Sequence, residues 1–502
     1  MVTHPTMGLA KARFAARTAA ASSDRLRAGL MGCVAIACVA GITAPLNSAA
    51  AQSECRLTPS LDQPPGKAPD DVCGADGITE RDFHKFSWQV FKFLVWPAGS
   101  GDRDRGKSDT ARSITSMQGP RVFETFKADW EIFRPNAQEP VPWDEYPPLE
   151  PCSNAKEMGP GAMVLASFNK FGNIKTGGGA VQSHVLVAQN RTYVRYQAGY
   201  NAIIFEKIKG SHLYDAGVVR DVPDVRPGER IPEVAESPVG AIIVKSAWIE
   251  LPGESARVDP PRFYVRHDAW VQDPKKTECR KASVGLVGLH VAYKTKSRPQ
   301  WIWSTFEHVD NVPEPGDRAG KRYTFNNGKR QTVMTDDPED RYLISKIEAS
   351  ELREPPTPYQ VIRRQKIDAK VLQVNQVWQG ELGRINSVWR NYKLVMTEWP
   401  RFASGPTLDA HGAGPTPKCF PTTPATANTT METFRQRCDP ELTCMGCHNS
   451  VRRTDFIWAI RLNKHRPLEF SGPSPNEEAT KQLQEILGKG AVGTNAARPR
   501  PR

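Results

Sequence analysis

The chain has 502 residues and a formal net charge of +12, and 39% of its residues are hydrophobic and 8% aromatic. This composition excludes an intrinsically disordered chain, because there is enough apolar surface for a sizeable core, and the length predicts two or three domains. A nucleic-acid partner is not expected, because the basic residues are scattered and lack the interleaved aromatic residues that single-stranded nucleic acid needs.

Residues 1–51 are predicted to be a cleavable signal peptide. A basic leader is followed by an apolar stretch at 28–44 and by small residues at 49–51 that resemble an A-x-A cleavage site. A retained membrane anchor is the less favoured alternative, because the apolar stretch is short for a membrane span and the cleavage signal follows it. The expected mature protein is therefore periplasmic or secreted and has no transmembrane span.

An exported chain is expected to form disulfides. Six cysteines lie outside both the signal peptide and the C-x-x-C segment described below, so up to three disulfides are expected. Proximity in the sequence suggests two pairs and leaves a third: Cys55–Cys73, Cys419–Cys438 and Cys152–Cys279. Other connectivities stay open, because spacing alone does not determine pairing.

Helical periodicity appears after a Pro/Asp-rich arm that is predicted at 52–78. Four apolar residues at helical spacing predict a helix that ends before Pro97. They are Phe83, Phe86, Val90 and Phe93. Further helices are predicted at 121–133 and 373–397, and we expect these helices to flank the structure formed by the middle of the chain.

Between residues 162 and 308 the sequence changes to short segments rich in β-branched and aromatic residues, separated by turn signals. The predicted strands are 181–188, 192–197, 239–250, 262–271, 282–294 and 299–308. Because strands recur without regular helices between them, we expect an antiparallel sheet and not a doubly wound one. A short helix at 201–209 is predicted to interrupt the series.

Residues 444–448 form the motif C-x-x-C-H, which is typical of covalent haem attachment. Two thiols at this spacing can reach the two vinyl groups of one macrocycle, and the histidine that follows can bind the iron from the same side. Its Nε2 binds the metal, while its Nδ1–H usually donates to a backbone carbonyl that orients the ring. The sequence therefore predicts one covalent haem c, attached at Cys444 and Cys447, with His448 as the proximal iron ligand.

Two other kinds of site use the same C-x-x-C spacing. A thioredoxin-like redox pair needs a preceding strand in a βαβ unit, whereas this motif follows a Pro-rich linker and a predicted helix with Thr429 and Glu432 as its capping box. A zinc site needs two further ligands at ribbon spacing, and only Cys438 is close. The predicted export signal favours haem over these sites and over a chance match, because haem is attached covalently outside the cytoplasm.

The domain organisation follows from these patterns. The expected fold class is α+β, with an antiparallel β-sheet-rich main domain and flanking helices at 79–401. A Pro/Gly/Thr-rich stretch at 406–424 marks the domain boundary. The linker and a small, mainly helical c-type haem-binding segment are predicted at 402–487, followed by a disordered tail at 488–502.

The remaining contacts of the haem are left open by the sequence. No methionine follows the motif, which excludes the downstream axial methionine of small c-type cytochromes. The candidates for the distal ligand are Met431, His290, His308 and His465. Core packing is the favoured interpretation of Met431 and His290, a solvated basic loop is favoured for His465, and a vacant or water-occupied position is the further alternative. Lys294 and Arg298 are candidates for binding the haem propionates, from their charge alone.

His308 is also a candidate for acid–base catalysis on a ligand of the haem. In a strand, His308 lies on one face while Trp303 and Glu307 lie on the other. Its neighbours Glu307 and Asp310 suit such a role. The favoured alternative is that the tryptophans belong to a core and the polar residues cap a turn, because nothing in the sequence places this strand beside the haem.

Several blocks between residues 80 and 460 carry a resemblance to known proteins. They are Phe86–Gln89, Trp96–Pro97, Gly119–Phe126, Arg298–Asn311, Trp399–Pro400 and Ala427–Phe434. With the C-x-x-C-H motif, they resemble a poorly characterised family of large secreted monohaem cytochromes of Gram-negative bacteria. The resemblance implies haem attachment through Cys444, Cys447 and His448, and it implies no further functional residue.

The sequence supports two functions. The first is electron transfer by a periplasmic cytochrome, with a redox partner protein or a small-molecule oxidant or reductant. The alternative is a haem enzyme of peroxidase or oxidase type with an open distal site, and a haem-based sensor is a third possibility. An electron carrier needs only about one small domain to shield a haem edge. Most of this chain precedes the haem segment, so the question whether it is an enzyme stays open.

Overall fold

A computed structural model of the protein describes residues 59–463 apart from several gaps. The gaps are 75–76, 102, 148–151, 155–156, 160, 169–184, 227–228, 254–260, 274–275, 318–319, 330–355, 357, 401–426, 434–435 and 437–442. All described residues belong to one unit, Ala50–Arg502. Several predicted features lie outside the described residues: the signal peptide, the stretch at 406–424, the tail at 488–502, Cys55, Cys419, Cys438 and His465.

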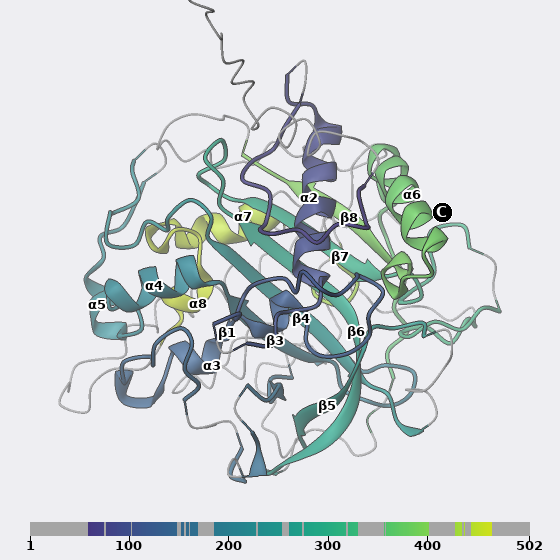
Figure 1. The fold of residues 1–502 in the computed structure, drawn as a ribbon, viewed down its shortest axis with the longest axis horizontal. Coiled ribbons are helices and arrows are strands. Elements are labelled where there is room, and N and C mark those ends of the chain that lie inside the picture. Colours follow the sequence, from purple (N-terminus) through teal and green to yellow (C-terminus); the bar gives the residue numbers. More distant parts are fainter. Residues whose placement is uncertain are drawn as a thin grey trace, which may run out of the picture. The chain divides into compact units, whose positions relative to one another are not determined.

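An eight-stranded sheet forms the centre of the described part of the chain (Figure 1). Its strands are β1 (Lys127–Ala128), β2 (Val164–Leu165), β3 (Arg195–Tyr200), β4 (Ile242–Glu250), β5 (Val265–Gln272), β6 (Cys279–Tyr293), β7 (Ile302–His308) and β8 (Tyr392–Glu398). The strand order is β1-β3-β4-β6-β5-β2, and β7 pairs with both β6 and β8. Among these strands β2 and β5 run parallel, and the other pairs are antiparallel. The expected antiparallel character of the sheet is confirmed.

The sheet curls around its longest strand, β6. Residues 279–285 of β6 pair with β5, and residues 288–293 pair with β7. Because β4 pairs with residues 284–293, β5 and β7 share the opposite edge of β6. The β4–β6 register shifts where β6 has the extra residue Val287, and the β5–β6 register shifts between Arg266 and Ala269, where β5 has one extra residue. A bulge bends the strand that carries it.

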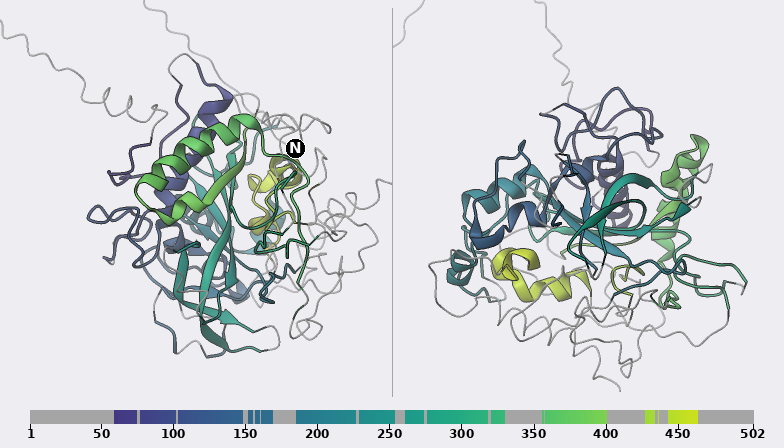
Figure 2. Two further views of the ribbon diagram at one scale, coloured as in Figure 1. Left: turned by 90° about the vertical axis from the view of Figure 1, so that its right-hand side faces the viewer. Right: turned by 90° about the horizontal axis from the view of Figure 1, so that it is seen from below.

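Helices lie on both faces of this sheet, and Figure 2 shows α2 and α6 on one face and α7 and α8 on the other. The described helices are α2 (Glu80–Val95), α3 (Asp129–Ile132), α4 (Ala202–Gly210), α5 (Ala216–Asp221), α6 (Ala369–Arg384), α7 (Cys444–His448) and α8 (Trp458–Arg461). Short 3-10 turns are η1 (Val122–Thr125), η2 (Pro135–Ala137), η6 (Val388–Asn391) and η8 (Asn449–Thr454). Within the described residues, no helix combines the length and the apolar character that a membrane crossing needs.

Helix α2 confirms the helix predicted before Pro97. It begins at a capping box in which the backbone N–H of Thr79 donates to the carboxylate of Asp82 over 2.9 Å. Its apolar side is buried against α6 and the sheet. Trp88 stacks on Trp378 of α6 with ring centroids 5.4 Å apart, and its indole N–H donates to Asn375 over 2.9 Å. The aromatic residues of α2 therefore fill the core on this face of the sheet.

Two predicted helices were wrong in part. The segment 373–397 is helical only as far as Arg384, where α6 ends, and it continues as η6 and the strand β8. A left-handed residue, Asn386, turns the chain at φ 53°, and the segment after it pairs with β7. The segment 121–133 forms η1, β1 and α3 in place of one helix. The short helix expected at 201–209 is confirmed as α4, which Asn201 caps.

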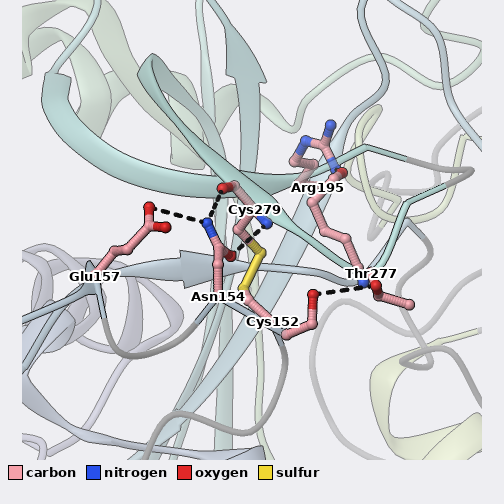
Figure 3. The surroundings of a disulfide bond; sticks show 8 residues. Cys152, Asn154, Glu157, Arg195, Thr277 and Cys279 are labelled. Atoms are coloured by element: carbon pink, nitrogen blue, oxygen red, sulfur yellow. Dashed lines mark hydrogen bonds between the residues drawn. A yellow bond between two sulfur atoms is a disulfide. The ribbon is translucent and has the colours of Figure 1, made fainter.

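A disulfide joins Cys152 to Cys279, the first residue of β6, as predicted (Figure 3). Beside it, the side chain of Asn154 accepts from the backbone N–H of Cys279 over 3.0 Å and donates to its carbonyl over 2.9 Å. Cys73 is also disulfide-bonded, and its predicted partner lies outside the described residues. The described disulfide fixes the segment around Asn154 to the edge of the sheet.

Replacing both Cys152 and Cys279 by serine is expected to lower the free energy of unfolding by about 2–5 kcal/mol, because the bond closes a long loop in the unfolded chain. The two cysteines are 127 residues apart in the sequence. Guanidinium denaturation followed by tryptophan fluorescence measures the change. Ser153→Ala is the matched control, since it removes only an exposed hydroxyl contact with Thr277. Equal stability of the double variant and the control would contradict the expectation.

Candidate haem site

The C-x-x-C-H motif forms the short helix α7. Thr443 begins this helix, because its hydroxyl oxygen accepts from the backbone N–H of Gly446 over 3.0 Å. Cys444, Cys447 and His448 follow at positions i, i+3 and i+4, which lie on one side of a helix. All three side chains are partly exposed, and both cysteines are thiols. Met445 is fully buried in an apolar cluster on the other side of α7.

The ring of His448 is oriented by a backbone carbonyl. Its Nδ1 lies 2.6 Å from the carbonyl oxygen of Phe456. Because a carbonyl only accepts hydrogen bonds, Nδ1 carries a proton, and in the neutral ring the lone pair is on Nε2. A proximal haem histidine usually has such a backbone acceptor at Nδ1, and for His448 the acceptor is the carbonyl of Phe456.

The acceptor carbonyl lies in a tight left-handed turn. Asp455 and Phe456 have φ values of 50° and 65°, a conformation that costs roughly 1–2 kcal/mol per residue for side chains other than glycine. Local hydrogen bonds close the turn, since the N–H of Asp455 donates to Arg452 over 2.9 Å and that of Phe456 to Val451 over 3.2 Å. The Phe456 ring is fully buried with Met445 and Ile457, and this packing helps to hold the strained turn.

Trp303 of β7 lies against the proximal histidine. Its ring centroid is 4.2 Å from that of His448, with 43° between the two planes. Ile302 and Phe306 point to the opposite face of β7, where they join the core with α2 and α6. The alternation predicted for this strand is therefore present, and it places Trp303 on the face that receives the C-terminal segment.

Glu398, the last residue of β8, anchors the beginning of α7. Its carboxylate accepts from the backbone N–H of Met445 over 3.1 Å. Burial raises the pKa of Glu398, while hydrogen bonds from Met445, Thr443 and Cys444 oppose the shift. No local pattern in the sequence indicates this role of Glu398, because an acidic residue at the end of an apolar segment carries no signal of a contact about 50 positions away.

Residues 427–433 are anchored to β7 in a similar way. The side chain of Asn428 donates to the hydroxyl of Thr305 over 2.9 Å, and the hydroxyl of Thr429 donates to Glu307 over 2.8 Å. The predicted capping box at Thr429 and Glu432 is wrong: residues 429–433 form turns and no helix, the N–H of Thr429 donates to Glu307, and Glu432 accepts from the N–H of Asn428.

Glu307, which accepts from the Thr429 hydroxyl, is a buried carboxylate. Burial opposes ionisation of Glu307, but Arg363 and Lys393 outweigh it and lower its pKa to about 2. Glu307 and Arg363 are both fully buried and form an ion pair. A Cβ atom at Gly288 would clash with the Thr430 hydroxyl, so the close approach of this segment to the sheet needs a glycine there.

The described candidates for the distal ligand have other contacts. Nε2 of His290 lies 3.3 Å from the carboxylate of Glu432, and Met431 is buried in a third apolar cluster with Val287 and Phe325. His308 faces away from Trp303 along β7. Its Nε2–H donates to the carbonyl of Arg262 over 2.8 Å, and its Nδ1 accepts from the N–H of Asp310 over 3.1 Å. The structure therefore brings Cys444, Cys447 and His448 together, and it holds His290, His308 and Met431 in contacts of their own.

The two residues suggested for the haem propionates also have defined partners. The ammonium group of Lys294 donates to the carboxylate of Asp455 over 2.9 Å. The guanidinium group of Arg298 lies over the ring of Phe83, 4.9 Å from its centroid. Lys294 thus contacts the turn that orients His448. The positive charge of Lys294 alone did not indicate this contact.

The chain matches no protein-family profile, no curated protein and no solved structure. The site is therefore interpreted from its own geometry.

The buried, neutral imidazole of His308 predicts acid-sensitive stability. Burial lowers the pKa of His308 to about 4 from an ordinary 6.5. Between pH 6.5 and pH 4, His308 is therefore protonated in the unfolded chain but neutral in the folded chain. Its contribution is present above pH 6.5 and lost as the pH falls toward 4, by roughly 3 kcal/mol in total. Urea denaturation at several pH values measures this loss, which His308→Gln is expected to remove. His267→Gln, at an exposed histidine, is the control, and an unchanged pH dependence in His308→Gln would contradict the assignment.

The Glu398 contact predicts a difference between two substitutions. Glu398→Ala leaves the N–H of Met445 buried without its acceptor, and we expect the free energy of unfolding to fall by about 1–3 kcal/mol. Glu398→Gln retains an acceptor oxygen and is expected to cost less. Chemical denaturation compares both with Glu206→Ala, at an exposed position of α4. Equal stability of the alanine and glutamine variants would show that the hydrogen bond does not matter.

Proposed function

We propose that this chain is a monohaem c-type cytochrome that carries one haem c and transfers electrons. Cys444 and Cys447 would hold the haem through thioether bonds, and His448 would be the proximal iron ligand. The observation that carries the proposal is the hydrogen bond from Nδ1 of His448 to the carbonyl of Phe456. It places a proton on Nδ1, so in the neutral ring Nε2 is the nitrogen with the lone pair that an iron ligand needs, and the two thiols lie on the same side of α7 as His448.

The donor set of this chain fits a haem. The two cysteines are partly exposed thiols, as covalent attachment to a macrocycle requires. The buried Met445 and the Glu398 contact fix α7 on the sheet, and Trp303 covers the side of the His448 ring. When bound, the haem supplies a one-electron redox couple, and the protein supplies its attachment, the orientation of its ligand and part of its shielding from water.

The cellular location proposed for this cytochrome is the periplasm or the outside of the cell. The predicted signal peptide supports export, and the Cys152–Cys279 disulfide is of a kind that persists in oxidising compartments. The expected partner is a redox protein or a small-molecule oxidant or reductant. In this proposal the segment at 402–487 is the haem-binding end of an α+β protein.

A haem enzyme of peroxidase or oxidase type is the second candidate function. The observation in its favour concerns the described candidates for the distal ligand: His308 is hydrogen-bonded to backbone atoms, Met431 is buried in an apolar cluster, and His290 lies beside Glu432. A distal position that none of them fills could accept a small ligand. His308 is not proposed as an acid–base residue, because backbone atoms engage both of its ring nitrogens.

The absorption spectrum of the mature protein tests both functions. The protein is produced in a host that attaches haem in its periplasm, and ferric and ferrous spectra are recorded with and without CO. Low-spin bands that ignore CO are expected for an electron-transfer cytochrome, whereas a ferrous band that CO shifts would support the enzyme. Haem that stays on the polypeptide in a denaturing gel shows covalent attachment.

Substitutions of the motif provide the control for this experiment. Cys444→Ser with Cys447→Ser is expected to abolish covalent haem, while Cys152→Ser with Cys279→Ser is expected to retain it, because that disulfide belongs to the sheet. A wild-type protein that is folded and exported but carries no haem would overturn the proposal.

A further inference from the structure

We infer that the buried ion pair of Lys294 and Asp455 is a positioning device that holds the Phe456 carbonyl against His448 and thereby sets the redox potential of the iron. This inference rests on the proposed haem function. It adds two residues that neither the C-x-x-C-H motif nor the resemblance to other cytochromes assigns.

The pair joins the C-terminal turn to the sheet. Asp455 is fully buried, and one oxygen of its carboxylate accepts from the ammonium group of Lys294 over 2.9 Å and from the backbone N–H of Ser237 over 2.8 Å. Lys294 follows β6 directly and is 2% exposed. Its own N–H donates to Ala241 over 3.0 Å, and its carbonyl accepts from Gly240 over 2.8 Å. Asp455 is therefore held between the end of β6 and the segment that leads into β4.

Asp455 directly precedes Phe456, whose carbonyl orients His448. Asp455 and Phe456 are both left-handed, with φ values of 50° and 65°, so the turn depends on contacts from its surroundings. The Asp455 carboxylate and the buried Phe456 ring provide these contacts from two directions. Loss of the contacts of the Asp455 carboxylate is expected to move the Phe456 carbonyl away from Nδ1 of His448.

The chemical consequence concerns the electron density of the imidazole. A carbonyl that accepts from Nδ1–H makes the ring a stronger donor to iron, which stabilises the ferric state and lowers the midpoint potential. Weakening this hydrogen bond raises the potential. The pair thus would act on the iron through the position of the Phe456 carbonyl, and neither of its members is a proposed attachment residue or iron ligand.

A purely electrostatic effect of the same two charges gives a different pattern. Removing the negative charge of Asp455 would raise the potential, and removing the positive charge of Lys294 would lower it. Positioning predicts a rise in both cases, because either substitution releases the turn. The direction of the Lys294 effect therefore separates the two explanations.

The experiment measures the midpoint potential of the holoprotein by spectroelectrochemical titration in Lys294→Met and Asp455→Asn. A rise in both variants is expected, together with a lower Fe–His stretching frequency wherever a five-coordinate ferrous form can be prepared. Lys294→Arg keeps the charge and is expected to restore most of the wild-type potential. The matched control is Lys127→Met. Lys127 is as buried as Lys294, and the contacts shown for its ammonium group, within the described part of the chain, are with Glu131, Glu145 and Phe205. The midpoint potential of this variant is expected to stay unchanged.

A second measurement on the haem-free chain separates this inference from the proposed function. In ¹⁵N-labelled apoprotein, His448 is expected to be protonated at Nδ1 in the wild type and to show mixed tautomers in Asp455→Asn, which also keeps the inference testable if Lys294→Met does not fold. Absence of haem from the wild type would overturn the proposed function. Opposite shifts of potential in the two variants, no shift, or an unchanged His448 tautomer would overturn the positioning role.

Discussion

A histidine can bind iron through Nε2 in a defined orientation only if its other ring nitrogen keeps a proton and a fixed acceptor, and the carbonyl of Phe456 meets both needs for His448. The position of this acceptor depends in turn on further contacts. The carbonyl points at His448 because two successive residues are left-handed, and these residues stay left-handed because Asp455 and the Phe456 ring are held by neighbours. The geometry of one imidazole thus depends on contacts of Asp455 with Lys294 at the end of β6 and with Ser237.

Buried charges mark the places where the C-terminal segment meets the sheet. Glu307 with Arg363, Asp455 with Lys294, and Glu398 at the beginning of α7 are each almost inaccessible to solvent. A buried ion pair contributes little net stability, because desolvation offsets most of the attraction, but breaking one is costly. Among these groups, the Lys294–Asp455 pair joins the C-terminal segment to the end of β6, so it favours the docking position that keeps both charges paired.

The two faces of the sheet are used differently. One face carries the aromatic core formed with α2 and α6. The other face presents Trp303, Glu398 and the Glu307 pair to the C-terminal segment. The main domain is larger than the shielding of a haem edge requires. Its sheet supplies one side of the candidate site, which is one reason for this size.

The sequence by itself determined the features that depend on neighbouring residues. Helical spacing places Cys444, Cys447 and His448 on one side of α7, the periodicity of α2 indicates its buried face, and alternation along β7 separates Trp303 from His308. The tertiary structure alone decided that residues 392–398 form a strand, since their apolar spacing also suits a helix and pairing with β7 selects the extended form. It also decided the partners of Lys294 and Glu398, because Lys294 and Asp455 are 161 residues apart and no local pattern encodes a contact over that distance. Local geometry follows from the order of residues along the chain, whereas long-range contacts follow from how the sheet folds and what it can bury.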